Sequence, residues 1–173
     1  RLGLLALMAG GCGPTNAAVG TSRPRAEPRA LEMAFRTPAG EWIHAGDLRG
    51  RPLLIFAFAT FDGVSQAALR PLGRFARRFD DVAVLGVASQ PDARMLLDPY
   101  EHALTPPFPL VYDPEGDVHQ GTSALGAIET VPTFIMFDAF GVEVGRHVGF
   151  PNTHTLDRLR EDAIDRGGIE DPD

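Results

Sequence analysis

Two apolar runs of strand length, residues 53–59 and 82–88, lie on either side of a segment with helical spacing. The residues of that segment divide between an apolar face and an arginine face: Leu69, Leu72, Phe75, Ala76 and Phe79 on the first, and Arg70, Arg74, Arg77 and Arg78 on the second. This pattern predicts a strand–helix–strand unit of the kind that builds a parallel sheet. We expect the arginine face to be an ordinary solvent-exposed helix surface, and the alternative is a site for an anion or a lipid headgroup.

The second half of the chain predicts a helix, three further strands and a final helix. The strands are expected at residues 108–112, 133–137 and 142–148. The turn between the last two is so short that it forces them to be antiparallel. The helix before them is expected to be interrupted at Pro99, and the last helix begins at Asn152 or Thr153, which are both good N-cap residues. Together the elements predict a single α/β domain over residues 30–165, with a central mixed sheet flanked by helices.

The N-terminal segment has the layout of an export signal. Arg1 precedes an apolar run at residues 2–8, which small residues separate from the lone cysteine, Cys12. Small residues before a cysteine resemble the lipoprotein box of bacteria, in which the cysteine receives diacylglycerol. We therefore expect residues 1–12 to be a signal segment with lipidation at Cys12, and the alternative is an ordinary cleaved signal.

The segments on both sides of the domain differ from it in composition. Residues 13–29 are rich in Gly, Pro, Ala and Arg and have no hydrophobic periodicity, so we expect a disordered, flexible tether there. Residues 166–173 form an acidic tail. With a lipid on Cys12, the tether would display the domain in the bacterial cell envelope, facing the periplasm or the exterior, with the membrane as a partner through the anchor.

Composition excludes several classes of function. The chain of 173 residues carries 16 basic and 23 acidic residues and a formal net charge of −7, which argues against nucleic acid as a partner. One cysteine excludes an intramolecular disulfide, a Cys-x-x-Cys pair and a metal site with several thiolate ligands. The five histidines show no spacing typical of a metal site, and no glycine-rich phosphate loop occurs. We therefore expect no metal and no cofactor.

Four strings of residues, in order along the chain, carry a family resemblance. They are GDLRGRPLL at 46–54, FATF at 58–61, VPTF at 131–134 and HVG at 147–149. The first resembles the approach to a central strand, the second the Trp-Ala-Thr-Trp that precedes a redox motif, and the last two a cis-proline strand and the end of the next strand. Together they resemble the thioredoxin superfamily, in particular its extracytoplasmic TlpA/ResA-type branch and the redoxin group with the AhpC/TSA-like peroxiredoxins. The resemblance implies a thioredoxin-like fold over residues 30–165.

The chain departs from this family at the redox motif itself. The matching positions are Asp62, Gly63, Val64 and Ser65, where the family has two cysteines. Disulfide exchange proceeds by attack of a thiolate, which neither a carboxylate nor a hydroxyl can replace, so no residue is assigned a catalytic role. Asp62 is expected to cap the following helix. The alternative is that its charge imitates the thiolate and keeps a neighbouring groove in the shape found in reduced members of the family.

The proline of the third string has a role that needs no sulfur. The resemblance implies a cis bond before Pro132, which exposes the backbone of Val131 to an extended peptide. Thr60, Phe61, Val131 and Pro132 are therefore the candidate peptide-binding residues. The alternative is that Pro132 only maintains the fold.

These observations favour a non-redox binding or scaffold module of the cell envelope, with an extended peptide or an envelope protein as its partner. The alternative is a thiol-disulfide oxidoreductase or peroxiredoxin-family enzyme of cell redox homeostasis with an atypical active site. Such an enzyme would have to use the thiols of a partner, or a residue that no motif identifies. The resemblance alone does not decide between them, because one fold serves many functions.

Overall fold

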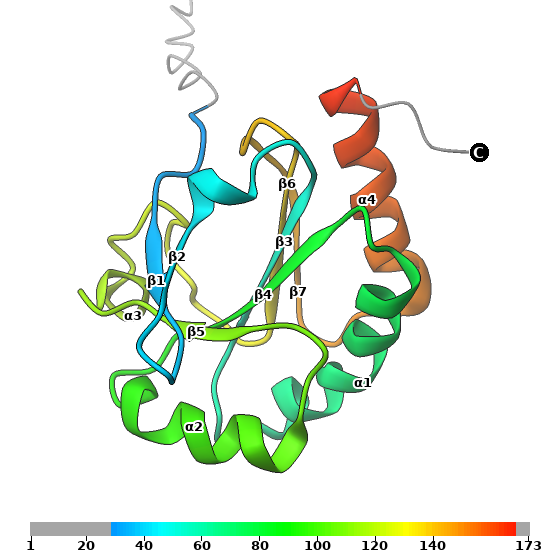
Figure 1. The fold of residues 1–173 in the computed structure, drawn as a ribbon. Helices are drawn as coiled ribbons and strands as arrows, with labels where there is room; N and C mark the ends of the chain where they lie inside the picture. The colour runs from blue at the N-terminus through cyan, green and yellow to red at the C-terminus, as the bar shows by residue number, and fades with distance from the viewer. Residues whose placement is uncertain (1–28, 169–173) are drawn as a thin grey trace, which may run out of the picture.

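The computed structural model describes residues 29–168 (Figure 1). The expected signal segment with Cys12, the tether up to residue 28 and the tail from residue 169 lie outside the described residues. In chain order the elements are β1 (Ala34–Arg36), β2 (Trp42–His44), a short 3₁₀ helix η1 (Ala45–Leu48), β3 (Leu53–Phe58), α1 (Gly63–Arg78), β4 (Ala83–Ala88), α2 (Ala93–Leu104), β5 (Leu110–Tyr112), α3 (Asp117–Gln120), β6 (Thr133–Phe137), β7 (Glu143–Val148) and α4 (Thr153–Gly167). Within residues 29–168, no helix combines the length and the apolar character that a bilayer span requires.

The seven strands of the described residues form one mixed sheet, in the order β2-β1-β5-β4-β3-β6-β7. The three central strands β3, β4 and β5 are parallel, and the remaining pairs are antiparallel. Helix α1 makes the crossover from β3 to β4, which confirms the strand–helix–strand unit expected from the sequence. The β6–β7 hairpin is antiparallel, as its short turn predicts.

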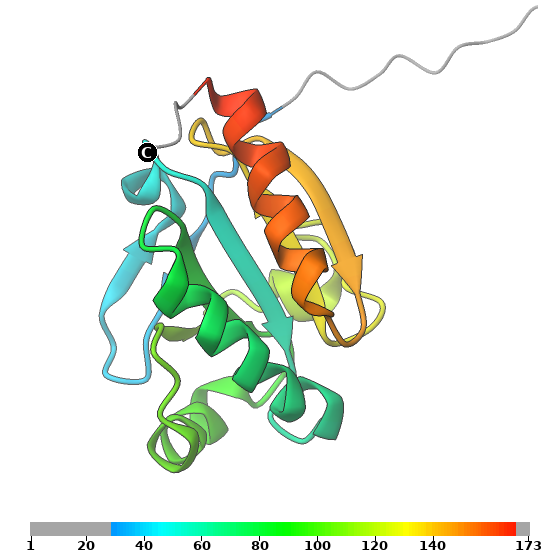
Figure 2. The same ribbon diagram turned by 90° about the vertical axis from the view of Figure 1, so that its right-hand side faces the viewer.

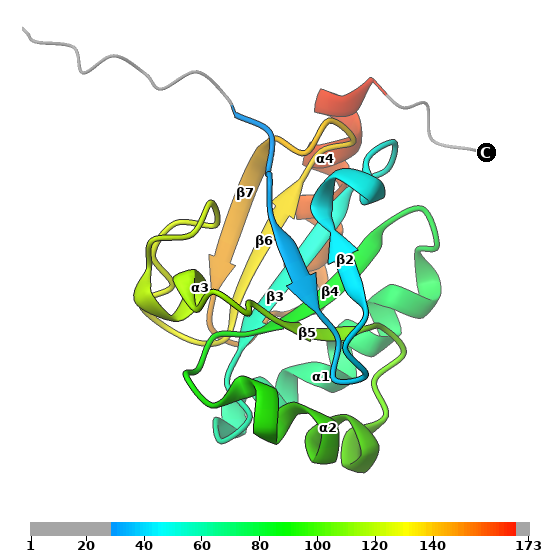
Figure 3. The same ribbon diagram turned by 60° about the vertical axis from the view of Figure 1, so that its left-hand side comes forward.

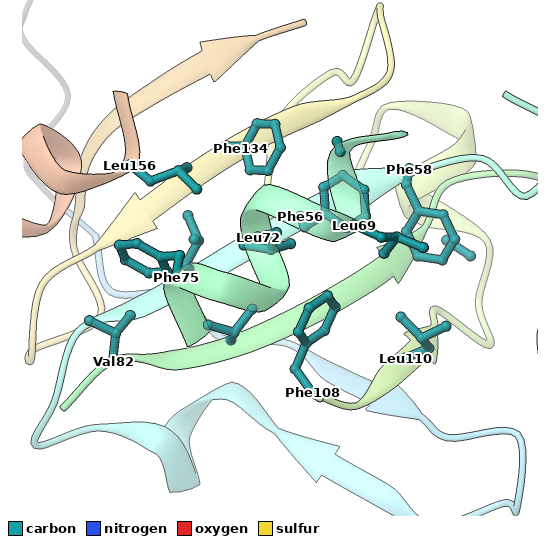
Figure 4. Close-up of a cluster of buried hydrophobic side chains, with 14 of the residues drawn as sticks. Phe56, Phe58, Leu69, Leu72, Phe75, Val82, Phe108, Leu110, Phe134 and Leu156 are labelled. Atoms are coloured by element: carbon teal, nitrogen blue, oxygen red, sulfur yellow. The ribbon is translucent and has the colours of Figure 1, made fainter. Parts of the chain in front are cut away.

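Helices cover both faces of this sheet. Figure 2 shows α1 and α4 in front of it, and Figure 3 shows α3 on the opposite side. All six residues of β3 are buried, and successive side chains alternate between two apolar cores. Phe56 and Phe58 join the core under α1 and α4, where the rings of Phe56 and Phe134 lie 5.1 Å apart (Figure 4). Leu53 and Ile55 join the core on the side of α3.

Helix α2 differs from the sequence-based expectation. It continues through Pro99 to Leu104, whereas an interruption at the proline is predicted. Leu97 and Tyr100, on either side of the proline, are both buried in the apolar core, so their packing holds the two turns in place. Pro99 itself is exposed. Tertiary packing therefore offsets the hydrogen bond that the proline cannot donate.

The register of the sheet brings three separate segments to one of its ends. Ala57 of β3 pairs with Thr133 of β6, and Thr133 pairs with Val148 of β7. The residues that follow β3, precede β6 and follow β7 therefore lie at the same end. We call it the motif end, made of residues 59–65, 130–132 and 149–150.

Candidate functional site

Helix α1 begins at the motif end with Asp62 as its N-cap. The carboxylate of Asp62 accepts a hydrogen bond from the backbone N–H of Ser65 at 2.6 Å. The chain enters this position through a turn in which the N–H of Asp62 donates to the carbonyl of Ala59 at 3.1 Å. The cap satisfies one of the N–H groups that a helix leaves free at its start. The capping role expected for Asp62 is thus confirmed.

The pKa of the Asp62 carboxyl is lowered below its ordinary value. The Ser65 hydroxyl contributes most to this; partial burial opposes the shift, and the N–H groups of Ser65 and Val64 lower the pKa further. The hydroxyl acts through proximity rather than through a well-formed hydrogen bond, because the buried Ser65 Oγ has no hydrogen-bond partner among residues 29–168. Asp62 therefore carries a negative charge at neutral pH, at the positive end of the α1 dipole.

Two buried hydroxyl groups accompany this carboxylate. The Ser65 side chain is fully buried and the Tyr100 hydroxyl is buried as well, and neither has a hydrogen-bond partner within the described part of the chain. The Tyr100 ring stacks on Phe58, with the ring centroids 5.4 Å apart. Burial, and next the negative charge of Asp62, raise the pKa of Tyr100 to about 12. Tyr100 therefore stays neutral at physiological pH.

A buried glutamine fixes the loop that leads into α1. Gln90 Oε1 accepts a hydrogen bond from the N–H of Thr60 at 2.6 Å, and Gln90 Nε2 donates to Asp92 Oδ1 at 2.9 Å. From the other side, Gln66 Nε2 donates to the carbonyl of Thr60 at 2.9 Å. Gln90 is not among the residues predicted from the sequence. The signal that could identify it is its position just after the apolar run 82–88, at the carboxyl end of the strand beside β3.

The segment before β6 is tied to the end of β7. The Pro132 carbonyl accepts a hydrogen bond from the N–H of Gly149 at 2.8 Å, and Thr133 Oγ1 donates to the carbonyl of Thr130 at 2.6 Å. The peptide bond between Val131 and Pro132 is cis, as the family resemblance implies. The hydrogen bond between Gly149 and Pro132 holds the start of β6 against the end of β7 at the motif end.

The structure brings the four predicted peptide-binding residues to this one end of the sheet. Thr60 and Phe61 follow β3, while Val131 and Pro132 precede β6. Thr60 and Pro132 are buried and Val131 is half-buried, whereas the Phe61 side chain is 76% exposed. Large apolar side chains exposed at the motif end form what we call the apolar rim: Phe61, Val64 and Phe150.

The motif end combines apolar surface with a negative charge. Its first motif position, Asp62, is partly exposed, and its fourth, Ser65, is fully buried. Both positions hold oxygen where disulfide exchange needs sulfur. Within residues 29–168, no three His, Cys, Asp or Glu side chains are grouped so that they could hold a metal ion.

Comparison with known proteins gives the fold. No protein-family model and no curated protein matches the sequence, but solved structures do. The exposed lipoprotein thioredoxin Etrx1 of Streptococcus pneumoniae is 20% identical, with a TM-score of 0.64 over 76% of this chain and 99% of that one. A thiol:disulfide interchange protein of the thioredoxin family from Chlorobium tepidum is 18% identical, with a TM-score of 0.64 over 80% of this chain and 99% of that one. A secreted disulfide oxidoreductase of Mycobacterium tuberculosis is 16% identical, with a TM-score of 0.60 over 78% of this chain and 96% of that one. The chain therefore has a thioredoxin-like fold, as its sequence predicts.

Removal of the Asp62 cap should destabilise the protein at neutral pH. We expect Asp62→Ala to lower the free energy of unfolding by about 1 kcal/mol, and Asp62→Asn, which keeps a capping oxygen, to lower it less. Because the pKa of Asp62 is lower in the folded protein than in the unfolded chain, the stabilisation is present above the unfolded-state pKa of about 4 and is lost as the pH falls through the folded-state pKa. Urea unfolding at neutral and at acidic pH measures both effects.

The control is Asp165→Ala, which removes an exposed carboxylate from α4. If Asp62→Ala loses no more stability than this control, or if its loss does not shrink at acidic pH, the cap does not stabilise the helix in the way described.

Proposed function

We propose that this chain is a binding module that takes an extended segment of another envelope protein at the motif end and that does not exchange disulfides. One observation carries the proposal. At the two positions where the matching redox motif has cysteines, the chain has a helix-capping carboxylate, Asp62, and a fully buried hydroxyl, Ser65.

The chemistry of disulfide exchange supports the non-redox part of the proposal. A redox-active thiolate sits at a helix N-terminus, where the dipole and the free N–H groups lower its pKa. Asp62 occupies this place with a charge of its own, and an oxygen nucleophile forms no mixed disulfide. The carboxylate thus imitates the charge of a thiolate and holds the start of α1 in position, without the reaction.

The surface around Asp62 supports the binding part of the proposal. Single exposed apolar side chains are common on proteins, but the three of the apolar rim gather at one end of the sheet. The half-buried Val131 leads into β6 beside them, and the backbone of such a segment can pair with an extended peptide. The ionised Asp62 disfavours acidic side chains at this point. The occupant we propose is therefore an extended segment with apolar side chains and without acidic residues next to them.

The second candidate is a redox enzyme that uses thiols of its partner. The similar structures favour it, because their names identify a thioredoxin, a thiol:disulfide interchange protein and a disulfide oxidoreductase. The likeness to them is one of fold, and a fold does not carry a reaction when the reacting atoms differ.

Activity assays separate the two candidates. We expect the full chain to reduce a protein disulfide no faster than dithiothreitol alone, and to consume no peroxide above background, because Asp62 and Ser65 supply no sulfur. The matched positive control is Asp62→Cys/Ser65→Cys, which puts sulfur at both motif positions of the same fold. Turnover by the wild-type chain in either assay would overturn the non-redox proposal.

Peptide binding should depend on the apolar rim. Peptides selected from a random library against the wild-type chain should bind Phe61→Ser about tenfold more weakly or worse, since burial of one large apolar side chain contributes about 1.5–3 kcal/mol. Fluorescence anisotropy with the labelled peptides gives the Kd.

Phe140→Ser is the matched control for this experiment. Phe140 is 62% exposed, in the turn between β6 and β7 at the opposite end of the sheet. Unchanged affinity of Phe61→Ser, or an equal loss in both variants, would contradict binding at the motif end.

We further propose that a lipid on Cys12 holds the domain in the cell envelope. The pattern of residues 1–12 supports this, and two of the similar structures are named as an exposed lipoprotein and a secreted protein. In a bacterial host, the wild-type chain with its export signal should partition into a detergent phase, and Cys12→Ser should stay in the aqueous phase. Equal partition of the two would refute lipidation.

A further inference from the structure

The exposed face of α1 carries four arginines that the motif end does not use: Arg70, Arg74, Arg77 and Arg78. The guanidinium of Arg78 lies 3.5 Å from the Asp157 carboxylate and 4.7 Å from the centre of the Phe79 ring. Arg74 and Arg78 line a hollow of about 190 Å³ to which Asp157 also belongs. The negative charge of Asp157 therefore offsets part of the positive charge of Arg74 and Arg78. The side chains of Arg70 and Arg77, by contrast, form no hydrogen bond or ion pair with any of residues 29–168.

Arg70 and Arg77 line a groove between α1 and the chain at and just after the C-terminal end of α2. The groove has a volume of about 520 Å³, and its opposite wall is formed by Leu104, Thr105, Pro106 and Pro107. We call it the arginine groove. Gly73 lies between the two arginines at the floor of the groove, next to Pro107. Among the described residues, those that line the groove include no Asp or Glu.

The two guanidinium groups are placed to act on one ligand. Arg77 lies seven positions after Arg70, which corresponds to about two helical turns and about 10 Å along the axis. Both long side chains therefore leave the same face of α1 and can reach a common point between them. A guanidinium presents a planar fork of N–H donors that matches the oxygens of a phosphate group.

The surroundings of the groove favour an anion that also carries an apolar organic group. The chain as a whole has a net charge of −7, yet no acidic side chain of the described residues faces these two arginines within the groove. The positive potential there is local and would attract an anionic group. Leu104, which is 42% exposed, and the two prolines of the wall offer apolar contact beside the charged groups.

We propose that the arginine groove binds a phosphate group, carried either by the headgroup of an anionic lipid or by a soluble organic phosphate. The phosphate oxygens accept hydrogen bonds from Arg70 and Arg77, and the carbon part of the ligand lies against Leu104 and the prolines. The groove adjoins the motif end at Gly63 but uses other side chains. Phosphate binding therefore does not depend on peptide binding.

A phosphate titration tests the site. Inorganic phosphate, added to the full chain and followed through the amide signals of α1 in NMR spectra, should bind in a saturable way. Arg70→Gln/Arg77→Gln should weaken this binding about tenfold or more, because it removes both charge-assisted donors. All variants carry Cys12→Ser, so that no acyl chain takes part. The matched control is Arg158→Gln/Arg166→Gln, which removes two exposed arginines from α4.

The outcomes decide both the site and the source of the phosphate. Absence of phosphate-dependent changes in α1, or the same loss of binding in both double variants, would overturn the proposal. Sedimentation with phosphatidylglycerol vesicles and with phosphatidylcholine vesicles then separates the two sources. Binding to the anionic vesicles that requires Arg70 and Arg77 assigns the groove to a lipid headgroup, whereas binding of inorganic phosphate without binding to vesicles assigns it to a soluble phosphate.

Discussion

The burial of β3 on both faces is the constraint on which the rest of the structure depends. Its six residues are all buried, with a parallel neighbour on one side and an antiparallel neighbour on the other. The backbone that leaves this strand still needs hydrogen-bond partners. The N–H and the hydroxyl of Ser89 donate to the carbonyl of Phe58, and Gln90 accepts from the N–H of Thr60. The loop that leads into α1 is thereby held by Ser89 and Gln90, which lie outside the four motif positions.

These contacts, together with the Asp62 cap, set the geometry of the motif end without sulfur. The first motif position lies partly exposed at the start of a helix, and the fourth is fully buried. Asp62 stabilises that helix start through its cap, and the apolar rim and the segment before β6 remain at the same end. The binding that we propose therefore needs no sulfur at the motif positions, because the apolar rim and the segment before β6 supply its apolar and backbone contacts.

Local signals predicted much of this structure, and contacts between distant residues account for what they missed. The runs 53–59 and 82–88 are long and apolar, so the central strands followed from the sequence, and the Asp62 cap followed because its partner lies three residues away. The break predicted at Pro99 is wrong because it rests on a local rule, and buried neighbours in the helix outweigh that rule. The position of Gln90 after the run 82–88 marks it only as a residue at a strand end, since its partner lies 30 residues earlier in the chain.

Asp62 also determines how a sulfur atom at position 65 would behave. A thiol at the place of the Ser65 hydroxyl would be buried beside a carboxylate, and both burial and the negative charge raise the pKa of a thiol. Ser65→Cys alone would therefore introduce a thiol that is almost entirely protonated. A single mutation of Asp62 removes the cap of α1 and supplies one thiol without its partner. A redox pair at these two positions therefore requires both replacements together, because either cysteine alone lacks its partner.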